Sequence, residues 1–108
     1  MTHKLLQAHI RESDRWRGQP LHEAIVDRCR ELGIAGASVF RGLEGYGSTA
    51  DIVRGRLAGH DLPLVVTVVD TGENIARLTP AIEEMVDKGL IAVEAVTARR
   101  VSKTPVLL

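Results

Sequence analysis

Residues 62–73 read Leu62-Pro63-Leu64-Val65-Val66-Thr67-Val68-Val69-Asp70-Thr71-Gly72-Glu73, a run of branched apolar residues followed by a polar quartet. β-Branched side chains favour strands, and the valines stand at odd and even positions, so they fall on both faces. A strand of this kind has to be covered on both sides. The quartet resembles a capping box, with Asp70 as N-cap and Glu73 at the third helical position. The segment therefore predicts a strand over residues 62–69 joined directly to a helix.

The chain after the quartet carries a helical pattern of apolar residues. This stripe consists of Ile75, Leu78, Ile82, Met85 and Val86. Gly89 supplies the stop, while Pro80 falls inside the helix and predicts a kink or a restart there. Residues 90–101 predict the last strand, and residues 102–108 a short tail that frays or docks on a neighbour.

The first part of the chain predicts a strand, a helix and a second strand. Residues 4–11 alternate between apolar and mixed positions, as a strand with one buried face does. Pro20 stands where a first helical residue is expected, and apolar residues at steps of four, four and three follow it as far as Gly33. We therefore expect a helix over residues 19–32 and a second strand over residues 34–41.

The order strand, helix, strand, strand, helix, strand predicts the fold. It is the order of an α+β, ferredoxin-like βαββαβ sandwich, in which two helices cover one face of an antiparallel sheet. We expect residues 1–108 to form this single domain. The other face of the sheet would expose half of the valine-rich strand, and such apolar patches usually mark interfaces. A closed homo-oligomer in which sheet faces meet is therefore expected.

Composition indicates which classes of partner and which cellular setting the chain fits. Fourteen basic residues balance fourteen acidic ones, which disfavours nucleic acid as a partner but leaves a small anion open. Cys29 is the only cysteine, so no disulfide can form within the chain and a reducing, cytoplasmic setting fits best. No stretch approaches the ~20 apolar residues of a membrane span.

The glycine-rich stretch after the second strand is the first candidate site. It reads Arg41-Gly42-Leu43-Glu44-Gly45-Tyr46-Gly47 and opens a long connection, residues 42–61. Its glycine spacing fits neither the phosphate loop nor the dinucleotide fingerprint. Connections of this length usually carry function or move. Two interpretations stay open: a ligand-binding loop, favoured by Arg41 and Glu44 on its flanks, or a structural turn at a subunit corner.

Two further groups of residues are candidates for binding an anion. Arg15, Trp16 and Arg17 would stack on a ligand and pair with its charge, and the alternative is a solvated turn. Arg99 and Arg100, near the end of the last predicted strand, would supply charge for a phosphate together with Lys103. The alternative is a solvated strand edge, where charges are common.

Catalytic and metal-binding patterns are missing from the sequence. The four histidines are dispersed without metal-ligand spacing, so a metal site would need several copies of His9 brought together by symmetry. Cys29 falls on the apolar stripe of the first helix, which predicts a buried core residue. No serine, threonine or cysteine has a recognisable base partner. We therefore expect that the protein is not an enzyme.

Three segments together resemble one family. They are Glu12-Ser13-Asp14-Arg15-Trp16-Arg17-Gly18-Gln19-Pro20-Leu21, the stretch Gly36-Ala37-Ser38-Val39-Phe40-Arg41-Gly42-Leu43-Glu44-Gly45-Tyr46-Gly47, and Asp61-Leu62-Pro63-Leu64-Val65-Val66 with Met85-Val86-Asp87-Lys88-Gly89-Leu90-Ile91. They resemble the motifs of the domain of unknown function 190 family, which belongs with the PII-like (GlnB-like) signalling proteins.

This resemblance implies a homotrimer with its sheets packed around a central axis. PII proteins bind adenine nucleotides between subunits and signal through a long loop between their second and third strands, the place that residues 42–61 occupy here. The outer part of this loop has no tyrosine that matches the PII modification site, and Asp87-Lys88-Gly89-Leu90 is not the PII glycine-rich turn. Family members often occur beside fluoride exporters, which suggests a membrane transporter as a partner.

The leading hypothesis is a PII-like regulatory protein, a trimeric sensor that binds a small anionic metabolite or nucleotide at subunit clefts. The predicted ligand-binding residues are Arg41, Gly42, Glu44, Gly45, Tyr46, Gly47, Arg15, Trp16, Arg99 and Arg100. The ligand itself stays open, with a nucleotide as one candidate, and no metal is expected in this hypothesis. The alternative is a CutA-like metal-tolerance or structural trimer without nucleotide binding.

Overall fold

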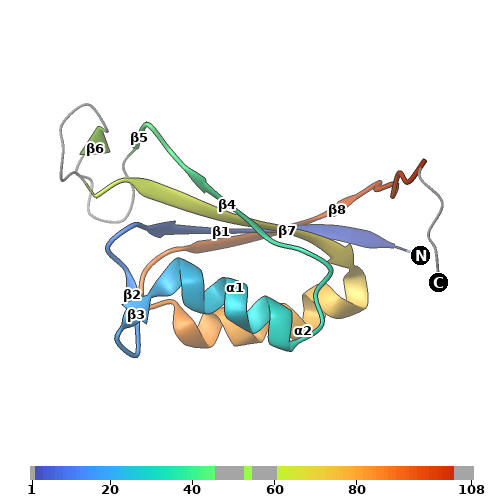
Figure 1. Ribbon diagram of the computed structural model, residues 1–108, viewed down its shortest axis with the longest axis horizontal. Helices are drawn as coiled ribbons and strands as arrows, with labels where there is room; N and C mark the ends of the chain where they lie inside the picture. The colour runs from blue at the N-terminus through green and yellow to red at the C-terminus, as the bar shows by residue number, and fades with distance from the viewer. Residues whose placement is uncertain (1, 46–52, 55–60, 104–108) are drawn as a thin grey trace.

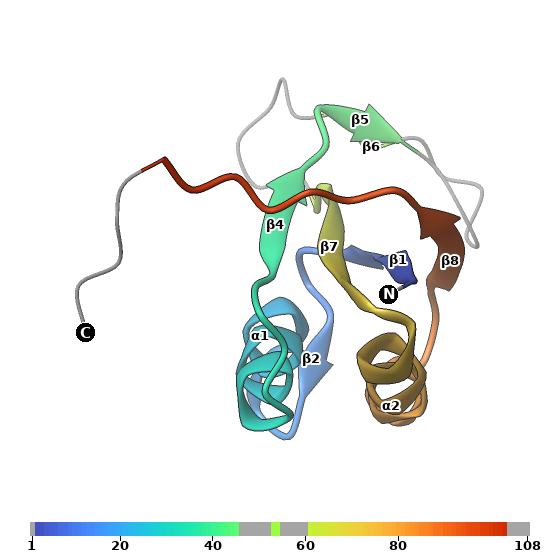
Figure 2. The same cartoon turned by 90° about the vertical axis from the view of Figure 1, so that its right-hand side faces the viewer.

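The computed structural model describes residues 2–45, 53–54 and 61–103 (Figure 1). Its elements are β1 (His3–Arg11), β2 (Arg15–Trp16), β3 (Gln19–Pro20), α1 (Leu21–Glu31), β4 (Ser38–Arg41), β5 (Glu44–Gly45), β6 (Val53–Arg54), β7 (Pro63–Thr71), α2 (Gly72–Met85) and β8 (Leu90–Val96). Four strands form the main sheet in the order β4-β7-β1-β8, with every neighbouring pair antiparallel. Both helices lie on one face of it (Figure 2). The predicted ferredoxin-like α+β fold is confirmed.

The core lies between this sheet and the two helices. Alternate residues of the central strands β1 and β7 point toward the helices, and the opposite residues of the pair share a face. The buried side chains include Leu6, Ala8, Ile10, Leu64, Val66 and Val68 from the sheet, Leu21, Ala24, Ile25 and Cys29 from α1, and Ile75, Leu78, Ile82 and Met85 from α2. The helical stripes that the sequence predicts are therefore the surfaces that cover the sheet.

Helix α1 begins two residues later than predicted. Pro20 is its N-cap and not its first helical residue, because Gln19 and Pro20 pair with Trp16 and Arg15 in a small hairpin, β2–β3. The helix ends at Glu31, and Gly33 follows at a φ of +74°, a backbone conformation that glycine adopts at little cost.

Helix α2 is capped by Thr71, so the predicted N-cap Asp70 is wrong by one residue. The Thr71 side chain accepts a hydrogen bond of 3.1 Å from the Asn74 N–H. The Asp70 carboxylate is used elsewhere: it accepts hydrogen bonds from the Ala35 N–H at 2.9 Å, from the Thr71 N–H at 2.7 Å and from the Asn74 amide at 2.9 Å. Asp70 thereby fixes the chain between α1 and β4 to the start of α2.

The predicted restart at Pro80 is wrong, since α2 is one helix from Gly72 to Met85. Leu78 and Ile82, on either side of the proline, are both fully buried, so both halves of the helix pack on the sheet. The helix ends at Met85, before Gly89, and the Val86 N–H donates to the Ile82 carbonyl.

Two outer strands are shorter than predicted. Strand β4 begins at Ser38, because the N–H groups of Ile34 and Ala35 donate to Cys29 and Asp70 instead of to a neighbouring strand. Strand β8 ends at Val96, which pairs with His3, the first residue of β1. The strand therefore ends where its partner ends, and residues 97–103 leave the sheet (Figure 2).

Candidate functional site

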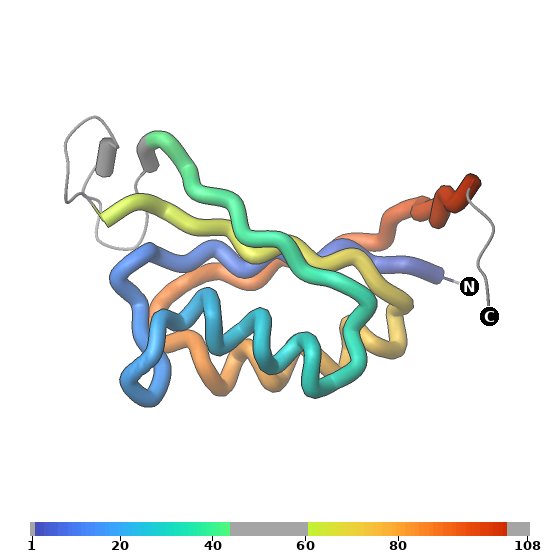
Figure 3. Tube along the Cα trace, in the orientation of Figure 1, coloured from blue at the N-terminus to red at the C-terminus, as the bar shows by residue number. Residues whose placement is uncertain are grey.

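The two ends of the connection between β4 and β7 meet at one end of the sheet (Figure 3). The Gly42 N–H donates to the Pro63 carbonyl at 2.8 Å. A Cβ atom on Gly42 would stand 2.7 Å from the Pro63 Cγ, closer than carbon atoms pack. Gly42 therefore serves the close approach of the two chain ends.

The turn that follows β1 contacts both ends of this connection. The Arg41 guanidinium pairs with the Glu12 carboxylate at 2.7 Å. The Asp61 carboxylate accepts hydrogen bonds from the Ser13 N–H at 2.8 Å and the Ser13 hydroxyl at 2.6 Å, and lies 3.5 Å from the Arg11 Nε. We call these five residues, Arg11, Glu12, Ser13, Arg41 and Asp61, the loop clasp.

The loop clasp brings together residues of three sequence motifs. Glu12 and Ser13 belong to the first family motif, Arg41 to the second, and Asp61 to the third. Sequence reasoning selected only Arg41 as a site residue and missed the other four. The signal was present, because Glu12, Ser13 and Asp61 stand inside the motifs that carry the resemblance, but the contact between Ser13 and Asp61 spans 48 residues of chain.

Arg41 is the member of the loop clasp best placed to bind an anion. Its side chain is 62% exposed, and one Nη atom makes the contact with Glu12. A guanidinium carries five donors in a planar fork that fits carboxylates and phosphates. Because an exposed ion pair contributes little free energy, a ligand anion can replace the Glu12 carboxylate at small cost.

The remaining predicted residues of the glycine-rich stretch are only partly described. The backbone of Glu44 and Gly45 pairs with Arg54 and Val53, so β5 and β6 form a second small hairpin next to the loop clasp. Tyr46 and Gly47 lie outside the described residues. Their role in ligand binding stays a prediction.

The predicted Arg15–Trp16–Arg17 group lies in the β2–β3 hairpin, on the helix side of the sheet. Arg15 turns back on the hairpin and donates to the Gly18 carbonyl at 2.7 Å. Arg17, and not Arg15, stacks on the aromatic ring, with its guanidinium carbon 4.8 Å from the centre of the Trp16 ring. The three residues thus lie in one hairpin, but Arg15 contacts the backbone of the turn and only Arg17 contacts Trp16.

Arg99 and Arg100 lie far from the loop clasp. Both are exposed in the segment that follows β8, and this segment leaves the sheet at the end opposite to the one where β4 continues into β5 (Figure 1). The long axis of the molecule measures 48 Å. Within one subunit, the predicted ligand residues therefore do not form one site.

The face of the sheet opposite the helices carries large exposed apolar side chains. Phe40 of β4 is 59% exposed, Val69 of β7 42% and Leu90 of β8 63%. His9 of β1 lies on the same face, where it pairs with Val65 and Leu90. We call this surface the open face.

Cys29 is confirmed as a core residue, and burial raises the pKa of its thiol to about 11. Over residues 2–45, 53–54 and 61–103, no group of three histidine, cysteine, aspartate or glutamate side chains is placed to hold a metal ion. Within the same ranges, neither helix has the length and apolar character needed to cross a bilayer.

This architecture is that of the PII-like and CutA1 proteins. A nitrogen regulatory PII-like protein from Thiomonas intermedia K12, bound to ADP, AMP and bicarbonate, aligns with a TM-score of 0.68 at 19% identity, over 93% of this chain and 91% of that one. The divalent ion tolerance protein CutA1 from Ehrlichia chaffeensis aligns with a TM-score of 0.62 at 16% identity, over 91% of this chain and 84% of that one.

The sequence defines the family within this fold. The model of DUF190, described as an uncharacterized ACR, matches residues 3–98. A UPF0166 protein from Aquifex aeolicus is 37% identical over 97 residues, which are 86% of this chain and 90% of the relative. The chain belongs to the DUF190 family, as its motifs predict.

Proposed function

We propose that this chain is a PII-like regulatory protein that binds a small anionic metabolite or nucleotide between subunits of a homotrimer and signals through residues 42–61. The observation that carries the proposal is the exposed guanidinium of Arg41 at the root of this segment, in exchangeable contact with Glu12. Its role is binding and not catalysis, and a membrane transporter in a cytoplasm-facing complex is the candidate partner.

The open face supports assembly into an oligomer. Phe40, Val69 and Leu90 expose apolar surface from three different strands, and a second sheet packed against them would remove that surface from water. A trimer also agrees with the distribution of the arginines. Arg99 and Arg100 are far from Arg41 within one chain. In an oligomer, Arg99 and Arg100 of one subunit can lie close to Arg41 of a neighbouring subunit.

The ligand chemistry follows from the arginines. Arg41, Arg99 and Arg100 would bind carboxylate, bicarbonate or phosphate oxygens through charge-assisted hydrogen bonds. The PII-like structure from Thiomonas intermedia is bound to ADP, AMP and bicarbonate, so these three compounds head the panel of candidate ligands. The predicted residues Glu44 and Tyr46 would complete the cleft, whereas Arg15 and Trp16 lie apart from it in the β2–β3 hairpin.

Isothermal titration calorimetry tests the proposal with ADP, ATP, AMP, bicarbonate, cyclic dinucleotides and fluoride. We expect at least one of these anions to bind, and Arg41→Gln to weaken that binding by about tenfold or more, since a bidentate charged contact is lost. Arg30→Gln is the matched control, because Arg30 is an exposed arginine of α1 outside the loop clasp. A folded protein that binds none of the panel would contradict the proposal.

His9 favours a second candidate function, that of a CutA-like metal-tolerance trimer. It is exposed on the open face between Val65 and Leu90, where packed copies would bring several imidazoles near one axis. Imidazole is a common ligand of zinc and copper. Titration with Cu²⁺ and Zn²⁺ should then show binding that His9→Ala abolishes and His22→Ala leaves intact. Equal binding by both variants would exclude His9 as the ligand.

A further inference from the structure

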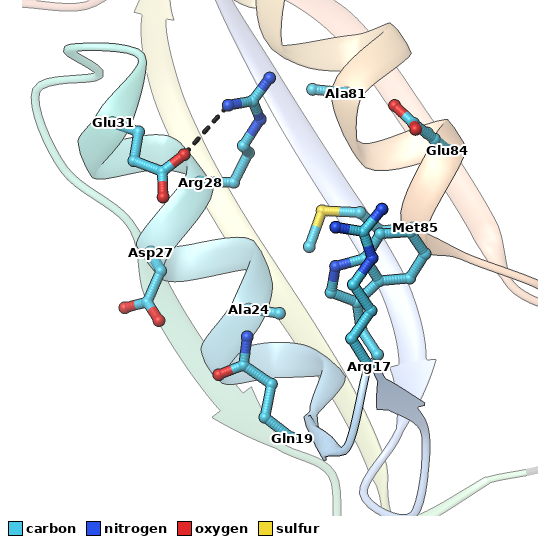
Figure 4. A pocket seen from close by; sticks show the side chains of 10 residues that line it. Arg17, Gln19, Ala24, Asp27, Arg28, Glu31, Ala81, Glu84 and Met85 are labelled. Carbon is cyan, nitrogen blue, oxygen red and sulfur yellow. Dashed lines mark hydrogen bonds and ion pairs between the residues drawn. The ribbon is translucent and has the colours of Figure 1, made fainter.

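A polar groove runs between the two helices, on the side of the molecule away from the open face (Figure 4). Its volume is about 370 Å³, which is in the range of sites for small ligands or single side chains. Ala24 of α1 and Ala81 of α2 line it with little bulk, and their small size leaves the space between the helices. The groove is separate from the loop clasp.

Trp16 forms one end of the groove. It is the only tryptophan of the chain and is partly buried against the core from the β2–β3 hairpin. The Arg17 guanidinium lies 4.8 Å from the centre of its ring, within the distance of a cation–π contact. The aromatic face that lines the groove is thus already occupied by a cation of the same chain.

Arg17 makes this contact from a left-handed backbone conformation, which is unfavourable for a residue with a Cβ atom. Arg17 and Gly18 are the two central residues of the hairpin turn, with φ angles of +47° and +84°. Turns of this kind favour asparagine, aspartate or glycine at both positions, and a side chain such as arginine is disfavoured at the first. Glycine at position 17 would keep the turn and remove the guanidinium, which makes this residue suitable for a test.

The other charges of the groove favour a cation. Arg28 and Glu31 pair with each other at 3.0 Å. Asp27 on α1 and Glu84 on α2 also line the groove, and neither makes an ion pair with another residue of the described ranges. If Arg17 left the ring, a bare tryptophan face would remain, together with the Glu84 carboxylate, which has no cationic partner in the described ranges. This combination recognises a flat cation.

We propose that the groove binds a guanidinium group on the face of Trp16, with Glu84 as its counter-charge and Arg17 as a built-in competitor for the same position. The ligand is a free guanidinium compound or the arginine side chain of a peptide. Because the groove lies outside the loop clasp, the inference is independent of the anion site and of the oligomeric state.

Trp16 fluorescence gives a direct readout, since no other tryptophan contributes. The probe is N-acetyl-arginine amide, and the control compound is N-acetyl-citrulline amide, which has nearly the same shape without the charge. We expect a saturable change with the arginine probe and none with the citrulline probe. A short arginine-containing peptide, compared with the same peptide carrying citrulline, distinguishes a peptide source from a free compound by tighter binding.

Three variants sharpen the test. Arg17→Gly should bind the arginine probe about tenfold more tightly, because the internal competitor is gone. Glu84→Gln should weaken binding several-fold, whereas Glu83→Gln, an exposed neighbour outside the groove, should not change it. Circular dichroism confirms that each variant is folded.

Three results would overturn the inference. One is the absence of a saturable response to the arginine probe in both the unmodified protein and Arg17→Gly. Another is an equal response to the citrulline probe, which would mean that charge is not recognised. The last is a response to AMP or phosphate in place of the arginine probe, which would make the groove an anion site.

Discussion

The two faces of strand β7 differ in what covers them. Leu64, Val66 and Val68 point toward the helices and are 3%, 0% and 1% exposed, whereas Val69, on the other face, is 42% exposed. Both faces are apolar in sequence, because a β-strand places neighbouring residues on opposite sides. The described part of the chain covers one face with its own helices and leaves apolar side chains of the other face exposed. Apolar residues on both faces of β7 therefore favour burial of both faces. The topology of the chain determines which of these faces its own helices bury.

The strongest test of this contrast is a cavity on the helix-covered face. Ile82→Ala removes a fully buried side chain and should lower the free energy of unfolding by about 2–5 kcal/mol. Because the helix face is closed within one chain, the loss should be the same at all protein concentrations in urea unfolding. Leu90→Ala, on the open face, should instead have an effect that depends on concentration. If the two variants showed the same dependence on protein concentration, the proposed difference between the two faces of β7 would be wrong.

A charge on the open face should separate the subunits without unfolding them. Phe40→Glu places a carboxylate where a partner sheet is expected, and an unpaired buried charge costs on the order of 3 kcal/mol or more. Sedimentation velocity should show a smaller species with unchanged circular dichroism. Ala76→Glu, on the exposed side of α2, is the control and should keep the assembly. An unchanged sedimentation coefficient for Phe40→Glu would place the interface elsewhere.

Two glycines contrast a tight position with an open one. A Cβ atom at Gly89 would stand 2.6 Å from the His9 carbonyl oxygen and 3.0 Å from the Val86 Cγ1, while one at Gly36 would meet nothing within 4 Å. Gly89→Ala should therefore cost about 1–3 kcal/mol, because the start of β8 must move away from β1. Gly36→Ala should be neutral in the same thermal unfolding experiment. Tolerance of alanine at position 89 would show that this contact is loose.

Asp70 should make stability depend on pH. Burial by itself raises the pKa of this carboxyl, but hydrogen bonds from Ala35, Asn74 and Thr71, together with the charge of His3, outweigh it and lower the pKa below its usual value. The contribution is therefore complete above the unfolded pKa of about 3.9 and is lost as the pH falls through the lower folded pKa.

Asp70→Asn measures this contribution. The variant should lose about 1–2 kcal/mol at neutral pH, because the amide replaces one acceptor oxygen by a donor. Its loss relative to the unmodified protein should shrink as urea unfolding is repeated at successively lower pH. A constant difference between the two proteins down to pH 2 would show that the ionised carboxylate is not the group that matters.

The main elements of the fold could be predicted because their signals are local. Alternation in residues 4–11 and the helical stripe from Ile75 to Met85 identify a strand and a helix without knowledge of their partners. The errors occurred where a distant residue decides the outcome. Asp70 looked like a cap, but its carboxylate binds Ala35, and β8 was predicted too long because its end depends on where β1 begins.

The candidate site was less predictable than the fold, for a physical reason. The contact between Ser13 and Asp61 joins residues 48 positions apart, so no local pattern reports it. The β2–β3 hairpin has two residues in each strand, too few to show alternation, and its turn uses Arg17 where glycine or asparagine would have been the signal. Arg41 could be selected because a charged residue beside glycines stands out in the sequence itself.

Native mass spectrometry of the freshly purified protein tests most directly whether further copies of the chain cover the open face. One chain has a mass of 11.8 kDa. We expect a single species of three times that mass, with any retained anionic ligand visible as added mass that disappears in Arg41→Gln. A species of 11.8 kDa at micromolar concentration, with no larger assembly, would contradict the proposal that the apolar half of β7 is a subunit interface.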